Sequence, residues 1–199
     1  MYPMIQGRFK APVTKVITPL CRGLLHIGIS ANALTVFGTL GVSFSALYFF
    51  GSEQLFLGTI IVSLFALSDL FDGTMARLSN SQGTKWGALL DSTLDRISDA
   101  AIALGIWLYF RNIDSEFQYV ALAVLLFGGL IPYVRARAES LGIECSVGVA
   151  ERAERLIITL VGTGLAGLGI ALALEIALGI LLLLSIVTVI QRMRVVYLS

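Results

Sequence analysis

Six long apolar runs, separated by short polar stretches, limit what this chain can fold into. A helix needs about 20 predominantly apolar residues to cross a bilayer, and 199 residues accommodate about six such helices without a separate soluble domain. Only 14% of the residues are charged, against about a quarter in soluble proteins. The sequence therefore predicts an all-α integral membrane protein, with a single domain over residues 1–199 and six transmembrane helices. The expected spans are about 33–50, 55–77, 86–110, 119–140, 150–173 and 176–190.

Residues 1–28, ahead of the first expected span, have a different pattern. Apolar residues recur there at helical spacing, while Lys15 and Arg22 fall between them. This pattern is typical of an amphipathic helix that lies at the membrane surface with its cations near anionic headgroups. We therefore predict an N-terminal interfacial helix, interrupted by prolines. Its apolar residues are Val13, Val16, Ile17, Leu20, Leu24 and Ile27.

The basic residues indicate how the spans are oriented, because cytoplasmic loops are enriched in Lys and Arg. Six spans place both termini on one side, and that side would hold all of the 14 basic residues except Arg111. We expect a multi-pass protein of the cell membrane with both termini in the cytoplasm. A net charge of +1 provides no clustered basic surface for a nucleic acid, so no nucleic-acid partner is expected.

Four aspartates stand out, because charges at membrane depth are costly and usually functional. Asp69 and Asp72 are three residues apart, and Asp91 and Asp95 are four apart, so each pair shares one face of a helix. Two adjacent helices could aim all four carboxylates into one volume, where hard oxygen ligands suit Mg²⁺ or Mn²⁺ and could hold two ions. The alternative is that the aspartates form salt bridges with neighbouring cations. The cations that could do so are Arg77, Lys85 and Arg96.

Residues beside the aspartates suggest what this metal site would act on. Gly73 and Gly87 allow close backbone approach, one on each helix. Arg77 adds a planar cation that suits phosphate oxygens. Carboxylates, metal and arginine together indicate a site for a phosphorylated substrate at the cytoplasmic face. Asp99, four residues after Asp95, is expected either to support the site from behind or to pair with Arg96.

These positions resemble a known family signature. The order Asp69-x-x-Asp72-Gly73-x-x-Ala76-Arg77, then Gly87-x-x-x-Asp91-x-x-x-Asp95, is similar to that of the CDP-alcohol phosphotransferases, which move a phosphatidyl-type group from a CDP-linked lipid to an alcohol. One departure is that the stretch from Leu78 to Trp86 is one residue longer than in the usual family pattern. The extra residue lies in the polar connection rather than among the expected metal ligands.

The resemblance implies six transmembrane helices, a homodimer and a two-metal site open to the cytoplasm. By position, Asp69, Asp72 and Asp91 would ligate the metals, and Asp95 would ligate one ion while serving as the general base. The segment Gly28 to Thr35 resembles the family's entry to its first span. The residues implied to bind the CDP-lipid are Asn32, Ala33, Leu34, Thr35, Gly73, Arg77 and Thr84.

Three further segments resemble one branch of the family, the bacterial phosphatidylinositol phosphate synthases, whose acceptor is inositol 1-phosphate. These segments are Tyr133–Glu139, Glu151–Ile158 and Gln191-Arg192. Arginines that converge from several helix ends would form a pocket for the acceptor phosphate, because bidentate pairs supply both charge and geometry. The positive-inside bias alone would also place arginines there. The candidates are Arg135, Arg152, Arg155 and Arg192, with Arg137 and Arg194 less favoured.

The predicted function is transfer of the phosphatidyl group from CDP-diacylglycerol to inositol 1-phosphate, with release of CMP and formation of phosphatidylinositol phosphate. Within the same family, a phosphatidylglycerophosphate synthase that uses glycerol 3-phosphate would also need a phosphate pocket. A divalent-cation transporter is a more distant alternative. It would explain carboxylates in the membrane but would not need Arg77 beside them, and cytoplasmic arginines would repel its cation.

Overall fold

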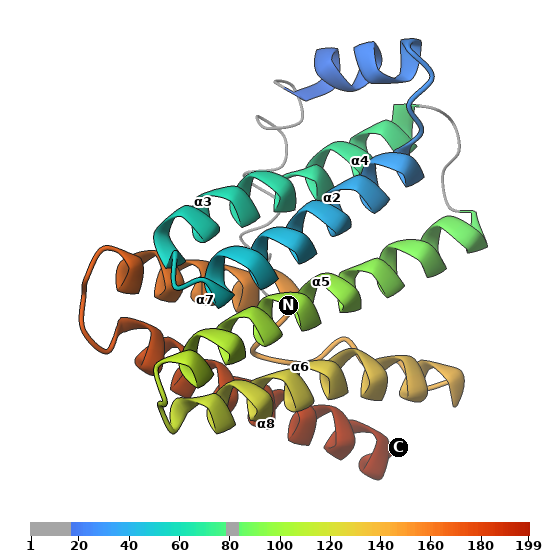
Figure 1. Ribbon diagram of the computed structural model, residues 1–199. Coiled ribbons are helices and arrows are strands. Elements are labelled where there is room, and N and C mark those ends of the chain that lie inside the picture. Colours follow the sequence, from blue (N-terminus) through green and yellow to red (C-terminus); the bar gives the residue numbers. More distant parts are fainter. Residues whose placement is uncertain (1–16, 79–83) are drawn as a thin grey trace. The chain divides into compact units, whose positions relative to one another are not determined.

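The computed structural model describes residues 17–78 and 84–199, and all regular structure within these ranges is helical. Figure 1 shows the helices in chain order. They are α2 (Ala31–Ser45), the π-helical turn η1 (Ala46–Phe50), α3 (Leu55–Ala66), α4 (Ser68–Leu78), α5 (Lys85–Asn112), α6 (Phe117–Ser140), α7 (Arg152–Gly167) and α8 (Ala173–Leu198). Residues 17–26 are also helical. The prediction of an all-α fold is confirmed.

The chain divides into two compact units, and three helices contribute to both. One unit contains residues up to 41 together with 64–95, and the other contains residues 42–63 and 96–199. The first unit therefore holds α4 and parts of α2, α3 and α5. The second holds η1, α6, α7 and α8 with the remaining parts of those three helices.

A small apolar cluster holds the first unit together. Ile17, Cys21 and Met75 are buried, and they pack against partly buried apolar residues that include Leu34 and Phe71. The helix over residues 17–26 thus turns part of its apolar side toward α2 and α4. Its other apolar residues are exposed, as Leu20 shows. The predicted apolar positions Val13 and Val16 lie outside the described residues.

Close helix packing builds the core of the second unit. Phe50, Ile106 and Phe110 are fully buried or nearly so, and a Cβ at Gly105 would collide with the backbone carbonyl of Ala46. The absence of a side chain at Gly105 therefore lets α5 lie directly against η1. α8 packs against both α6 and α7, where Leu174, Leu178 and Leu181 are buried.

Within residues 17–78 and 84–199, four helical segments are long and apolar enough to cross a membrane. They are Ala31–Phe50, Leu55–Met75, Phe117–Ser140 and Ala173–Leu198. The remaining two expected spans correspond to α5 and α7. α5 has 28 residues but carries several charged residues in its first half, and α7 has only 16 residues. Length and composition therefore support a membrane protein with four candidate spans.

Candidate active site

The first aspartate pair lies on α4, whose start is held closely against α2. A Cβ at Gly38 of α2 would overlap the side chain of Ser68, the first residue of α4. Asp69 follows in the first turn of α4 and is half-buried. A carboxylate at this position interacts favourably with the positive end of the helix dipole. The contact at Gly38 thus fixes the helix turn from which Asp69 projects.

The rest of α4 carries the other motif residues. Asp72 shares the helix face of Asp69, because the two residues are three apart in a continuous helix. Gly73 is exposed, and a Cβ built there would meet nothing within 4 Å. The surface at Gly73 is therefore open, as access for a ligand requires. Asp72 and Arg77 lie in α4, but their side chains are outside the described part of the structure.

The starts of α2 and α5 lie against each other. The Thr84 hydroxyl oxygen accepts a hydrogen bond of 3.0 Å from the Gly87 backbone N–H and so caps α5. A Cβ at Gly87 would lie 2.9 Å from that Thr84 oxygen and 3.6 Å from the side-chain oxygen of Asn32. Ser30 caps α2 in the same way, accepting from the N–H of Ala33 at 3.2 Å. The structure therefore brings together Asn32 and Thr84, which the resemblance implicates in CDP-lipid binding.

The four positions from Asn32 to Thr35 divide between the surface and the core. Asn32 and Ala33 are exposed, whereas Leu34 packs on the apolar cluster of the first unit. Thr35 is buried and donates its hydroxyl to the carbonyl of Ala31 at 3.0 Å. Only the first two of these residues thus present side chains to an approaching ligand.

The second aspartate pair lies on α5. Asp91 and Asp95 are four residues apart in this continuous helix, so they project from one face. Asp91 is exposed and Asp95 is half-buried. Among the described residues, no three acidic, histidine or cysteine side chains are grouped closely enough to hold a metal, and the Asp72 carboxylate is not among them. The donor chemistry of the motif, carboxylate oxygens alone, fits Mg²⁺ or Mn²⁺.

Two of the predicted acceptor arginines meet at Asp99. Arg155 of α7 donates to one carboxylate oxygen of Asp99 at 2.9 Å, and Arg152 lies 3.5 Å from the other. Arg155 also donates to the backbone carbonyl of Ala150 at 3.3 Å and is only 9% exposed. Asp99 is therefore the anchor of an arginine cluster that joins α5 to α7. We define this arginine cluster as Arg152, Asp99 and Arg155.

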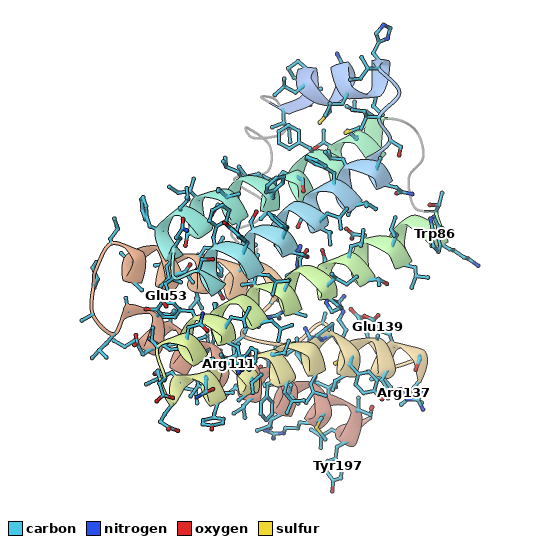
Figure 2. The ribbon with its side chains drawn as sticks, in the orientation of Figure 1. Glu53, Trp86, Arg111, Arg137, Glu139 and Tyr197 are labelled. Carbon is cyan, nitrogen blue, oxygen red and sulfur yellow. The ribbon has the colours of Figure 1, made fainter. Side chains whose placement is uncertain are left out.

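The other two predicted arginines have different surroundings. Arg192 of α8 is 3% exposed and donates to the backbone carbonyls of Val147 at 2.8 Å and Ile131 at 2.6 Å. It thereby fastens the segment between α6 and α7 to α8. Arg135 is exposed and forms an ion pair of 2.8 Å with Glu139 on the same helix. Figure 2 shows Glu139 near the carboxyl end of α6, with Arg137 close by.

The sequence alone does not identify the partners of Asp99, which is a further functional candidate. Its spacing of four residues from Asp95 predicts either support of the site from behind or an ion pair with Arg96. Arg155 is 56 residues away in the chain. The usable signal is the pair Arg152 and Arg155, because two cations three residues apart share one helix face and a carboxylate from a neighbouring helix can balance them.

Comparisons with known proteins bear on all of these candidate residues. The family model for CDP-alcohol phosphatidyltransferases matches residues 28–195. The chain is 42% identical over 198 residues to phosphatidylinositol phosphate synthase from Streptomyces avermitilis, covering 95% of this chain and 81% of the relative. It is 43% identical over 195 residues to the enzyme of that name from Cutibacterium acnes, covering 93% and 94%.

Solved structures agree with these sequence relatives. The crystal structure of Mycobacterium tuberculosis phosphatidylinositol phosphate synthase with CDP-DAG bound superposes with a TM-score of 0.86 at 37% identity, covering 92% of this chain and 94% of that one. The same mycobacterial enzyme in complex with manganese and citrate gives a TM-score of 0.84 at 36% identity, covering 90% and 88%. The resemblance found in the motif is thereby confirmed, and the chain belongs to the CDP-alcohol phosphatidyltransferase family.

Proposed function

We propose that this protein is an enzyme that transfers the phosphatidyl group of CDP-diacylglycerol to inositol 1-phosphate, producing phosphatidylinositol phosphate and CMP. The observation that carries the proposal is similarity over nearly the full chain to enzymes that are named phosphatidylinositol phosphate synthases. The match to the family model over residues 28–195 spans the positions of the aspartate motif and of the arginine segments of α6, α7 and α8. The mycobacterial neighbour with CDP-DAG bound supports the lipid substrate.

The aspartates would hold the metal and accept a proton. Asp69, Asp72, Asp91 and Asp95 would ligate two divalent ions, Mg²⁺ or Mn²⁺, and the manganese complex of the mycobacterial neighbour supports a divalent metal. When bound, such ions neutralise charge on the pyrophosphate of the CDP-lipid. Asp95 would accept the proton of the inositol 1-phosphate hydroxyl as its oxygen bonds to the phosphatidyl phosphorus. The bond from that phosphorus to the CMP oxygen breaks, and CMP departs.

The neighbouring residues would position the CDP-lipid. The guanidinium of Arg77 would bind a phosphate oxygen of the departing nucleotide. The open surface at Gly73 leaves room for the CDP moiety. Asn32 and Thr84 lie beside each other at the capped starts of α2 and α5. We assign the CDP moiety to these residues, together with the rest of the Asn32–Thr35 segment.

The acceptor phosphate would bind at Arg135, Arg152, Arg155 and Arg192. The contacts at Asp99 support this role for the α7 pair, since one carboxylate leaves two guanidinium groups with excess positive charge. That excess suits the phosphate group of inositol 1-phosphate. Arg192 and Arg135 would complete the pocket from α8 and α6.

The protein would cross the cell membrane six times as a homodimer, with both termini and the active site in the cytoplasm. Spacing of the two tryptophans supports α5 as a span: Trp86 and Trp107 are separated by about 31 Å at 1.5 Å per residue. That distance matches the hydrocarbon thickness of about 30 Å, and tryptophan is enriched at both membrane interfaces. Trp86 projects from the start of α5 (Figure 2). The exposed Leu20 supports an interfacial role for the helix over residues 17–26.

A CMP-release assay tests the proposed reaction. Purified protein receives CDP-diacylglycerol and Mg²⁺ with inositol 1-phosphate, glycerol 3-phosphate, inositol or serine in separate reactions. We expect CMP with inositol 1-phosphate and none with inositol or serine, because the arginine cluster selects a phosphorylated acceptor. We expect none with glycerol 3-phosphate, because the relatives are named phosphatidylinositol phosphate synthases. Release only with glycerol 3-phosphate would make the acceptor assignment wrong. No CMP release with any acceptor would contradict the assignment of this protein as an enzyme.

A further inference from the structure

A cavity lies among α5, α6, α7 and α8 in the second unit. Its volume is about 390 Å³, and most of its wall is aliphatic. On α5 its lining extends from Arg96 to Ile106, which is about 15 Å at 1.5 Å per residue. On α6 the wall includes Gly128 and Gly129, where a built Cβ would meet nothing within 4 Å. The cavity is therefore long, and the lack of side chains at Gly128 and Gly129 widens it.

The charged groups of this cavity are gathered at one end. Arg96, Asp99 and Arg155 belong to its lining, and they precede the aliphatic lining residues along α5 and α7. Asp99 already contacts Arg155 at 2.9 Å and Arg152 at 3.5 Å. The formal charge at this end is therefore positive. The cavity thus combines a cationic end with an apolar body.

These features define the chemistry of an occupant. An α-helix with its side chains is about 10–12 Å across, which is too wide for a cavity of this length and volume, whereas one alkyl chain fits. An alkyl chain from the membrane exchanges one apolar environment for another, so the aliphatic walls accept it without a desolvation cost and the charged end provides the preference. The guanidinium groups at the end favour an anionic headgroup.

We propose that this cavity binds a single-chain acidic lipid, with its alkyl chain beside Gly128 and Gly129 and its carboxylate at Arg96 and Arg155. The source of the lipid is the surrounding membrane. Because Arg155 is also assigned to the acceptor phosphate, the bound lipid would compete with inositol 1-phosphate. That competition rests on the proposed function, whereas binding of the lipid does not.

Photolabelling tests the binding without any substrate. The purified full chain in neutral detergent is exposed to a palmitate analogue that carries a diazirine in the middle of its chain, and the labelled peptides are mapped. We expect labels on the cavity faces of α5 and α6. Gly128→Leu should lower this labelling by about tenfold, equivalent to about 1.4 kcal/mol, because its side chain fills the cavity. Gly129→Leu, which places a side chain at the neighbouring lining position, should lower the labelling in the same way.

Gly179→Leu is the matched control. Gly179 is also a helical glycine with nothing within 4 Å of a built Cβ, and it lies on α8 outside the cavity lining. This variant should keep the labelling of the wild type. Equal labelling of the Gly128 and Gly179 variants would overturn the proposal, since it would mean adsorption to the outer surface. Absence of labels on the cavity residues of the wild type would also overturn the proposal. If the wild type shows no such labels and Gly128→Leu loses dimers while Gly179→Leu keeps them, the cavity is instead a contact with a second copy of the chain.

A kinetic measurement tests the competition separately. Palmitate should raise the apparent KM for inositol 1-phosphate in the wild type but not in Gly128→Leu. Hexadecanol, which has the chain without the charge, should leave that KM unchanged. Labelling without competition would place the headgroup away from the acceptor site and overturn the overlap at Arg155. Failure of the acceptor assignment would leave the labelling result intact, so the two proposals fail independently.

Discussion

Asp99 shows how one side chain can organise a site from outside the family motif. Its two carboxylate oxygens contact different arginines of α7, at 2.9 and 3.5 Å. Removal of one partner from a buried ion pair is costly because it leaves an uncompensated charge. The Asp99 carboxylate would repel an acceptor phosphate, so we infer that its role is to hold the two guanidinium groups in place. We therefore treat Asp99 as a positioning residue.

Asp99→Asn should raise the KM for inositol 1-phosphate by about tenfold or more, since a hydrogen bond to a charged group contributes about 1.5–3 kcal/mol. The KM for CDP-diacylglycerol should change little, because its proposed contacts lie on α2, α4 and the start of α5. Steady-state kinetics with each substrate varied in turn measures the difference. Asp114→Asn, an exposed aspartate beyond the far end of α5, is the control. Equal changes in both KM values would indicate general structural damage instead.

Asp95 is the aspartate proposed to accept the proton, and its loss should affect turnover most. Asp95→Asn should lower kcat by about 10²- to 10⁴-fold, the usual contribution of a general base. Binding of CDP-diacylglycerol should largely persist, because the other three carboxylates remain. Single-turnover CMP release and equilibrium binding of the lipid separate the two effects. Ser92→Ala, an exposed position on the same helix, should retain activity. A wild-type kcat in Asp95→Asn would remove this residue from the base role.

At the scale of elements, the start of α4 depends on one close contact. A Cβ at Gly38 would overlap the Ser68 side chain, and overpacking of this kind costs about 1–3 kcal/mol. Gly38→Ala should therefore lower the melting temperature and the CMP-release activity together, because it displaces the turn that carries Asp69. Thermal unfolding followed by circular dichroism measures the first effect.

The double variant Gly38→Ala with Ser68→Gly tests the cause of that loss. Ser68→Gly removes the atoms that the new methyl group would meet, so the pair should recover both stability and activity. Gly23→Ala, where a Cβ meets nothing within 4 Å, is the control and should cause no loss. If the double variant is no better than Gly38→Ala, the contact with Ser68 is not the reason for the defect.

Apolar runs located the helices well, but tertiary contacts set several of their ends. The expected span 55–77 is divided into α3 and α4 at Leu67, where the contacts of Gly38 and Gly41 hold the chain against α2. The expected span 150–173 ends at Gly167, because the following turn contains Gly169 and Leu172 with positive φ. Apolar composition hides such a turn. The two α7 arginines indicate that a carboxylate partner exists, but the sequence does not identify it as Asp99, because Asp99 lies on a helix distant in sequence.

At the scale of the molecule, the distribution of Lys and Arg along the chain is the strongest indication of how the protein is oriented in the membrane. Arg111 at the end of α5 is the one basic residue expected outside the cytoplasm, and its guanidinium carbon lies 5.3 Å from the centre of the Trp107 ring. A cation over an indole face is stabilised by the ring's electrostatic field, and we propose that Arg111 and Trp107 together anchor this end of α5 at a membrane interface. The polar residues from Asn112 to Glu116 should then be extracytoplasmic.

Reporter fusions test this orientation in cells. Green fluorescent protein fused after Ser199 should fluoresce, because it folds in the cytoplasm, whereas alkaline phosphatase at that position should be inactive. Alkaline phosphatase fused after Asp114 should be active, since residues from Asn112 to Glu116 would lie across the membrane from both termini. The physical reason is that six spans return the chain to its starting side, and the bias in Lys and Arg decides which side that is. Active phosphatase after Ser199 would require an odd number of spans or the reverse orientation, and either would separate the terminal arginines of α8 from the cytoplasm.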